Sequence, residues 1–216
     1  MKISLLLLAI LCTIVSKAQI TSGSLFLGGD LQISGSSTVT VDQSQAPSKY
    51  GSYTFSPVVG WAVKDNLIVG GKLIVSFSNN TAETTESEGY NYGGGFFARK
   101  YLPLGKSFYL FGEGNLLGRY NHNEQQSVQQ PGNYLEQKGF GISATLYPGI
   151  AYQVKKSFFL EASLNSLISF NYYHLKQENH AGSTTYKATQ NSYELSSSIG
   201  NGNPLQVGAR WIIPKK

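Results

Sequence analysis

The stretch FFARKYLPLGKSFYLFGEGNLL, residues 96–117, decides how this chain folds. Residues on either side of the segment LPLGK alternate in character, and a Pro and a Gly within a few positions are typical of a tight reversal. The stretch therefore predicts two β-strands joined by a short turn. Aromatic residues lie beside the turn, and Arg99 and Glu113 occupy positions that can point to one common face.

The remaining chain repeats this plan with different connection lengths. Apolar residues recur at every second position, the period of a strand with one apolar face. The predicted strands are residues 23–35, 53–63, 67–77, 90–101, 107–120, 139–154 and 158–174, with a last strand within 192–213 that is clearest from Leu205. Polar residues 36–52, 79–89, 121–137 and 175–191 are expected to form four long loops, and residues 201–204 are expected to interrupt the last strand.

An even number of strands, with short turns at one end and long loops at the other, is typical of outer-membrane barrels. The face opposite the apolar one is mostly Gly, Ser, Thr, Asn, Tyr and Gln, which suits a narrow lumen better than a water-exposed surface. Charged residues are only 13% of the chain. The sequence therefore predicts an all-β fold, an eight-stranded antiparallel up-and-down transmembrane β-barrel. A soluble barrel that carries a ligand, with its apolar face inward, is the alternative.

The first 18 residues differ from the rest. A positive start, an apolar run and the small-x-small sequence at 16–18 predict a cleaved secretory signal, residues 1–18, followed by one barrel domain, residues 19–216. A lipoprotein anchor at Cys12 is the alternative, although Leu11 stands where such signals require a small residue. Because Cys12 is the only cysteine, the exported chain is expected to have no disulfide. The formal charge of +5 falls to +3 without Lys2 and Lys17, too little to indicate nucleic-acid binding.

Few charges fall on the predicted lumenal face, and their signs nearly cancel. A buried charge without a partner is costly, so these charges are expected to pair in a lumenal network. The predicted members are Asp30, Lys72, Arg99, Glu113, Arg119, Glu161 and Arg210.

Aromatic residues gather near the strand ends, which predicts two girdles at the membrane interfaces. The predicted girdle on the short-turn side is Trp61, Tyr101, Phe108, Tyr152, Phe158 and Trp211. The second aromatic group, at the long-loop ends of the strands, consists of Tyr50, Tyr53, Tyr90, Tyr92, Tyr120, Tyr134, Tyr172 and Tyr193. Lysines near the short turns are expected to contact outer-membrane lipid head groups.

Four motifs carry a family resemblance: FARKYLP at 97–103, FGEG at 111–114, YPGIAY at 147–152 and FLEAS at 159–163. With them, residues 19–216 resemble the bacterial outer-membrane β-barrel domain family of small porin-like proteins. The resemblance implies eight strands, location in the bacterial outer membrane, both termini in the periplasm and insertion by the barrel-assembly machinery. Family members often end on an aromatic residue, whereas here Trp211 is followed by IIPKK.

A barrel of eight strands encloses a lumen that side chains can fill, and Tyr109, Phe111 and Tyr147 are expected to help fill it. The favoured hypothesis is a non-enzymatic protein of the envelope, acting through structure or through an unidentified partner of the long loops, without a cofactor. The first alternative is a narrow channel for small solutes or ions. The second is a lipid-modifying enzyme that uses His122, His174 or His180, although no motif frames a nucleophile and the spacing does not fit a metal site.

Overall fold

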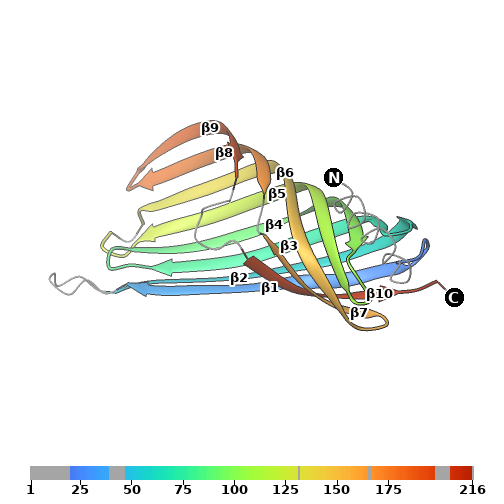
Figure 1. The fold of residues 1–216 in the computed structure, drawn as a ribbon. Coiled ribbons are helices and arrows are strands. Elements are labelled where there is room, and N and C mark those ends of the chain that lie inside the picture. The colour runs from blue at the N-terminus through green and yellow to red at the C-terminus, as the bar shows by residue number, and fades with distance from the viewer. Residues whose placement is uncertain (1–19, 39–46, 131, 165–166, 198–204, 216) are drawn as a thin grey trace, which may run out of the picture.

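The computed structural model describes residues 20–38, 47–130, 132–164, 167–197 and 205–215. Nearly all of them are in antiparallel strands (Figure 1). The strands are β1 Leu25–Thr38, β2 Ser48–Lys64, β3 Leu67–Thr81, β4 Thr85–Pro103, β5 Phe108–Ser127, β6 Tyr134–Lys155, β7 Phe158–Leu164, β8 Ile168–Ala181, β9 Thr184–Ser196 and β10 Leu205–Ile213. Among the described residues, no helix has the length and apolar character needed to span a membrane.

Eight of the strands close into a barrel. Consecutive strands from β1 to β6 pair as neighbours, β6 pairs with β7, β7 with β10, and β10 with β1. Residues 134–146 of β6, on the side of the long hairpins, pair instead with β8, which in turn pairs with β9. We call this side of the barrel the upper side and the short-turn side the lower side. The hairpin of β8 and β9 therefore continues the wall beyond the ends of β7 and β10, away from the short turns (Figure 1). The predicted fold class, an eight-stranded antiparallel barrel, is confirmed.

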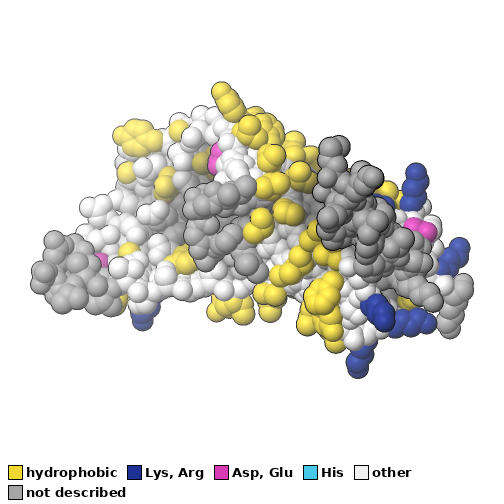
Figure 2. All heavy atoms as spheres, in the orientation of Figure 1, with side chains coloured by type: hydrophobic (Ala, Val, Ile, Leu, Met, Phe, Trp, Pro, Cys, Tyr) yellow, Lys and Arg dark blue, Asp and Glu magenta, His cyan; other side chains and the backbone are white. Residues whose placement is uncertain are grey.

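The two faces of the wall differ as the alternating pattern requires. Large apolar side chains cover the outside, for example Leu73, Phe96 and Leu116, which are more than half exposed. Figure 2 shows hydrophobic side chains spread over the middle of the barrel and several Lys and Arg side chains at the end where β10 finishes. The interior is a compact core in which aromatic rings and ion pairs lie together.

The seventh and eighth predicted strands each consist of two pieces. Residues 158–174 were expected as one strand, but β7 ends at Leu164 and β8 begins at Ile168. The pairing register along β6 is also not continuous from β7 to β8. Gly149 faces Ser163 on β7, whereas Leu146 faces Ile168 on β8. The last strand is likewise divided into β9 and β10. The predicted interruption at 201–204 lies outside the described residues. The predicted signal at 1–18 and its alternative, an anchor at Cys12, also lie outside them.

Three of the four predicted long loops are wrong as loops, because most of their residues are paired strands. Residues 79–89 hold only the short turn between β3 and β4, residues 121–137 continue β5 and β6, and residues 175–191 form most of the β8–β9 hairpin. These segments carry polar residues on both faces, so they lack a continuous apolar face. A search for strands with one apolar face therefore misses them.

The first described residues are anchored at the short-turn end of the barrel. The backbone of Ile20 exchanges two hydrogen bonds with Asn66, which sits at φ 61° in the turn between β2 and β3. Asn tolerates this left-handed conformation better than most residues. The side chain of Ile20 is 4% exposed and belongs to the interior core. The turn residue thus fixes the chain at the lower mouth of the lumen.

Candidate functional site: the lumenal ion network

Arg99 on β4 is the centre of the lumenal network. Its side chain is 1% exposed, and its Nε donates to the Glu113 carboxylate on β5 at 2.5 Å. Its Nη1 donates to both carboxylate oxygens of Glu161 on β7, at 2.7 and 2.6 Å. One guanidinium therefore joins two carboxylates from different parts of the wall. Such a pairing is what a buried arginine needs to offset the cost of leaving water.

The network continues from Glu161 to the first strand. Arg210 on β10 lies 3.4 Å from Glu161, between Nε and Oε2, and its Nη2 donates to Asp30 on β1 at 2.6 Å. Lys72 on β3 donates to the other oxygen of Asp30 at 3.2 Å. Six charges, three of each sign, thus form one connected chain through the lumen.

Aromatic rings hold the central guanidinium in place. The Arg99 Cζ lies 4.3 Å from the ring centre of Phe111 and 5.2 Å from that of Phe26. These distances fall within the range of cation–π attraction. Tyr147 donates its hydroxyl proton to Glu113, so the second carboxylate oxygen is also satisfied. Charge and apolar packing therefore fill the same cross-section of the lumen.

Tyr101 was expected in the girdle, and the structure contradicts this. Its side chain is 1% exposed inside the barrel, where its hydroxyl donates to Glu161 at 2.7 Å and accepts a hydrogen bond from Arg99 at 3.0 Å. The reason is the period of the strand. Tyr101 stands two positions from Arg99, so both side chains point to the same face.

The other predicted girdle residues point outward. Trp61, Phe108 and Trp211 are 54%, 54% and 48% exposed. Pairs of these aromatic rings touch on the outer wall: Phe108 with Tyr152, and Phe158 with Trp211. They lie on strands beside the short turns, as a membrane girdle would.

Arg119 is the one predicted network residue that does not join the others. It lies higher on β5 with its side chain on the lumenal face, and within the described residues it has no ion-pair partner. Its Nε is buried without a hydrogen bond, and so are side-chain atoms of Asn91, Asn121 and Ser143. The lumen above the network is therefore polar and incompletely paired within the protein.

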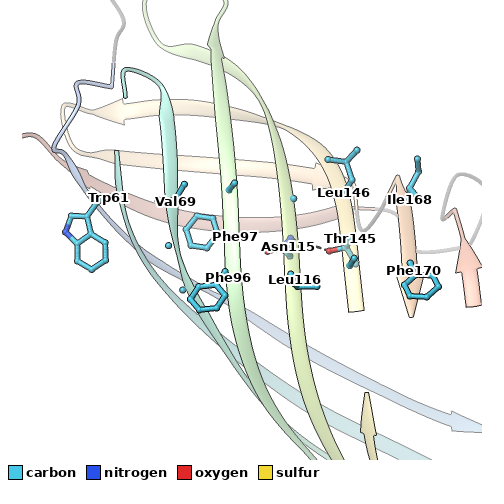
Figure 3. Close-up of a pocket in the computed structure, with 15 residues that line it drawn as sticks. Trp61, Val69, Phe96, Phe97, Asn115, Leu116, Thr145, Leu146, Ile168 and Phe170 are labelled. Atoms are coloured by element: carbon cyan, nitrogen blue, oxygen red, sulfur yellow. Dashed lines mark hydrogen bonds between the residues drawn. The ribbon is translucent and has the colours of Figure 1, made fainter. Parts of the chain in front are cut away.

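The outer wall carries a hollow of about 830 Å³. Small residues such as Ala98, Gly114 and Ala144 lie in it, between larger side chains such as Phe96 and Leu116 (Figure 3). On the inner side of the same strands, Asn115 donates to Thr145 at 3.3 Å, the dashed line of Figure 3. The large neighbours point outward and are apolar, which suits contact with lipid chains.

A row of glutamates, which sequence reasoning missed, crosses the wall on the long-hairpin side. Glu88 on β4 lies opposite Glu124 on β5, and Glu124 lies opposite Glu136 on β6. Glu136 in turn lies opposite Glu178 on β8. Like charges at directly opposite positions are unfavourable unless cations lie nearby. Lys138 donates to Glu136 and Lys187 to Glu178, and these hydrogen bonds lower the pKa of each carboxyl below its ordinary value. Only strand register reveals this row, because the four residues are far apart in sequence.

The three histidines lie on strands and do not share a site. His122 contacts Glu136 at 3.0 Å, His174 contacts Asn191 at 2.8 Å, and His180 stacks on Tyr134. Among the described residues, no group of three or more His, Cys, Asp or Glu side chains could hold a metal ion.

An antiparallel barrel of eight strands, apolar outside and polar with paired charges inside, is the architecture of outer-membrane β-barrels. No protein-family model matches the chain, and no curated protein does. Among solved structures, the chain is similar to the translocator domain of the autotransporter NalP from Neisseria meningitidis, at 10% identity and a TM-score of 0.49. The match covers 100% of this chain and 77% of that chain. The fold class rests on the strand ladders.

Proposed function

We propose that this chain is a non-enzymatic protein of the bacterial outer membrane, with a lumen closed by the ion network and hairpins that project from the cell surface. The observation that carries the proposal is the outer wall. Its middle is covered by exposed apolar side chains, while the charges of the same strands lie inside. Lipid is the solvent that suits such a surface.

Strand length supports the same placement. A membrane-spanning strand needs about 9–11 residues, whereas β4, β5 and β6 have 19, 20 and 22. The extra residues lie on the long-hairpin side, where the glutamate row and the lysines replace apolar side chains. Contact with an external partner, or a structural role in the envelope, would use this projecting part. Barrel-assembly machinery would insert the chain after export.

The two tryptophans allow a direct test. Trp61 and Trp211 are the only tryptophans of the chain, and both point outward near the short turns. In phosphatidylcholine vesicles carrying bromine at defined depths, bromines near the head group are expected to quench their fluorescence more than bromines near the chain end. The Trp61→Phe variant reports Trp211 alone. Strongest quenching from the chain end would contradict the girdle position, and absence of quenching in a folded barrel would contradict the membrane placement.

A further inference from the structure

The ladder between β1 and β10 ends halfway up the wall, although both strands continue. Residues 25–29 pair with residues 209–213. Above Gly29 and Ala209, β1 runs on beside β2 to Thr38, and β10 extends up to Leu205 beside β7. Over the described residues 30–33 and 205–208, the facing edges of β1 and β10 form no ladder. We call this place the split. Continued register would set Leu31 opposite Val207.

The lower end of the split is organised around Arg210. Its Nη1 donates to the backbone oxygens of Gly29 at 2.9 Å and Ala209 at 3.0 Å, the last residues that pair. Its Nη2 holds Asp30, the first residue above the ladder. The side chain fits there because position 28 is glycine, where a Cβ would collide with the Arg210 Cδ. The ladder thus ends at a defined set of hydrogen bonds.

The split lies at the height of the outer lipid leaflet. Leu25 faces Trp61 in the lower girdle, and Ile33 faces Tyr53 among the upper aromatic residues. The split begins midway between these levels. Leu31, Ile33 and Val207 beside it are 67%, 65% and 76% exposed, among the highest values for apolar residues of this chain.

Backbone edges in the hydrocarbon layer are tolerated only where they are buried in protein or border a water-filled cavity. The upper lumen behind the split is polar, with unpartnered buried atoms on Asn91, Asn121 and Ser143. It also holds Arg119, which has no ion-pair partner in the described part of the chain. Apolar side chains thus border the split on the outside of the wall. On the lumenal side lie polar side chains and Arg119, a cation without an ion-pair partner among the described residues.

We propose that the split is a lateral opening that binds a single-chain anionic amphiphile from the outer leaflet. The alkyl chain lies against Leu31, Ile33 and Val207, where the wall is apolar. The anionic head group, a phosphate or a carboxylate, lies in the upper lumen with Arg119 as its counter-ion. This activity goes beyond the proposed function and rests on its bilayer placement.

The test closes the split with a disulfide. Leu31→Cys and Val207→Cys are combined in the full chain with Cys12→Ser, refolded into phosphatidylcholine vesicles, and binding of radiolabelled hexadecyl phosphate is measured. The reduced protein is expected to bind saturably, and oxidation to weaken binding about tenfold or more. The control pair Phe55→Cys and Val75→Cys faces across the intact β2–β3 ladder, and its oxidation is expected to leave binding unchanged.

A second variant tests the head-group site. Arg119→Gln is expected to weaken binding of hexadecyl phosphate about tenfold and to leave binding of the uncharged hexadecyl maltoside unchanged. Equal binding by the oxidised and reduced split variants would overturn the lateral opening, as would uptake no greater than in protein-free vesicles. Unchanged phosphate affinity in Arg119→Gln would overturn the role of this cation. A chain that fails to insert, seen as no heat-dependent gel shift, would instead overturn the bilayer placement.

Discussion

The residues that hold the lumen together are few, and each touches several others. Arg99 contacts two carboxylates and lies beside three aromatic rings, so its removal affects all of them. In a buried ion network, removing one partner destabilises the protein by more than the intact pair stabilises it. The reason is that the remaining charge is left in a poorly solvating medium.

Arg99→Leu is therefore expected to destabilise the barrel by about 3–5 kcal/mol. Glu113 then keeps the Tyr147 hydroxyl but loses its cation. The measurement is urea unfolding of the refolded protein in vesicles. Lys100→Leu, at the adjacent exposed position, serves as the control and is expected to change stability by less than about 0.5 kcal/mol. Equal midpoints for both variants would argue against an interior ion network.

Tyr101→Phe tests the part of the network that sequence reasoning misplaced. Loss of the hydroxyl leaves Glu161 and Arg99 without one buried hydrogen bond each, so the expected cost is about 1–3 kcal/mol. The outward Tyr152→Phe is the matched control and is expected to be nearly neutral. A Tyr101→Phe variant as stable as its control would place the ring outside the network.

At the residue scale, alternation alone predicts which charges share the lumenal face, and it would also have placed Tyr101 there. The position of Tyr101 beside a short turn predicts a girdle residue, but proximity to a turn does not decide which face a side chain takes. The isolation of Arg119 could not be predicted, because pairing depends on the height of each strand in the barrel.

At the scale of the element, each of the long strands β3 to β6 combines a segment with an apolar outer face and a segment with polar residues on both faces. β3 contains a segment with an apolar outer face. Its outward residues are Leu67, Val69, Leu73 and Val75, whereas Lys72 points inward. The sequence predicts such segments well because one face is apolar. It does not predict the projecting segments, where polar residues on both faces resemble loops and only pairing with the next strand reveals the structure.

Leu73→Arg is expected to destabilise the barrel by about 2–4 kcal/mol, because it places a charge near the middle of the lipid-facing wall. The side chain is 61% exposed, so no packing inside the protein is lost. Unfolding in vesicles measures the change. Ala188→Arg on β9, an exposed position opposite the uncharged Gln177 on the β8–β9 hairpin, is expected to be neutral within about 0.5 kcal/mol. A neutral Leu73→Arg would contradict contact with lipid at this position.

The β8–β9 hairpin is expected to open more readily in acid. The hydrogen bond from Lys187 lowers the pKa of Glu178 below its ordinary 4.5. The stabilising contribution of this pair is therefore complete above the unfolded-state pKa and is lost as the pH falls through the lower folded-state pKa. Amide exchange protection of residues 176–187, compared above and below pH 4.5, measures the effect. Glu178→Gln is expected to reduce the pH dependence, because only Glu136 on the neighbouring strand then titrates in this range. Protection that does not change with pH in the native protein would exclude the ion pair.

At the scale of the whole molecule, the ring of eight strands determines both the closed lower lumen and the split above it. The sequence predicts the number of strands in the barrel and that the short turns gather at one end of it, because turn lengths and alternation are local signals. It could not predict that the ladder between β1 and β10 stops at Gly29, since these strands meet only when the barrel closes.

The central claim is that the ion network and the aromatic core close the lumen of a membrane barrel. Single-channel recording of the refolded protein in a planar bilayer tests it most directly, with the heat-dependent gel shift as proof of folding. The account predicts a folded, inserted barrel without discrete conductance steps. Reproducible steps from the native protein would contradict it and would favour a narrow channel past Arg99 and Glu113.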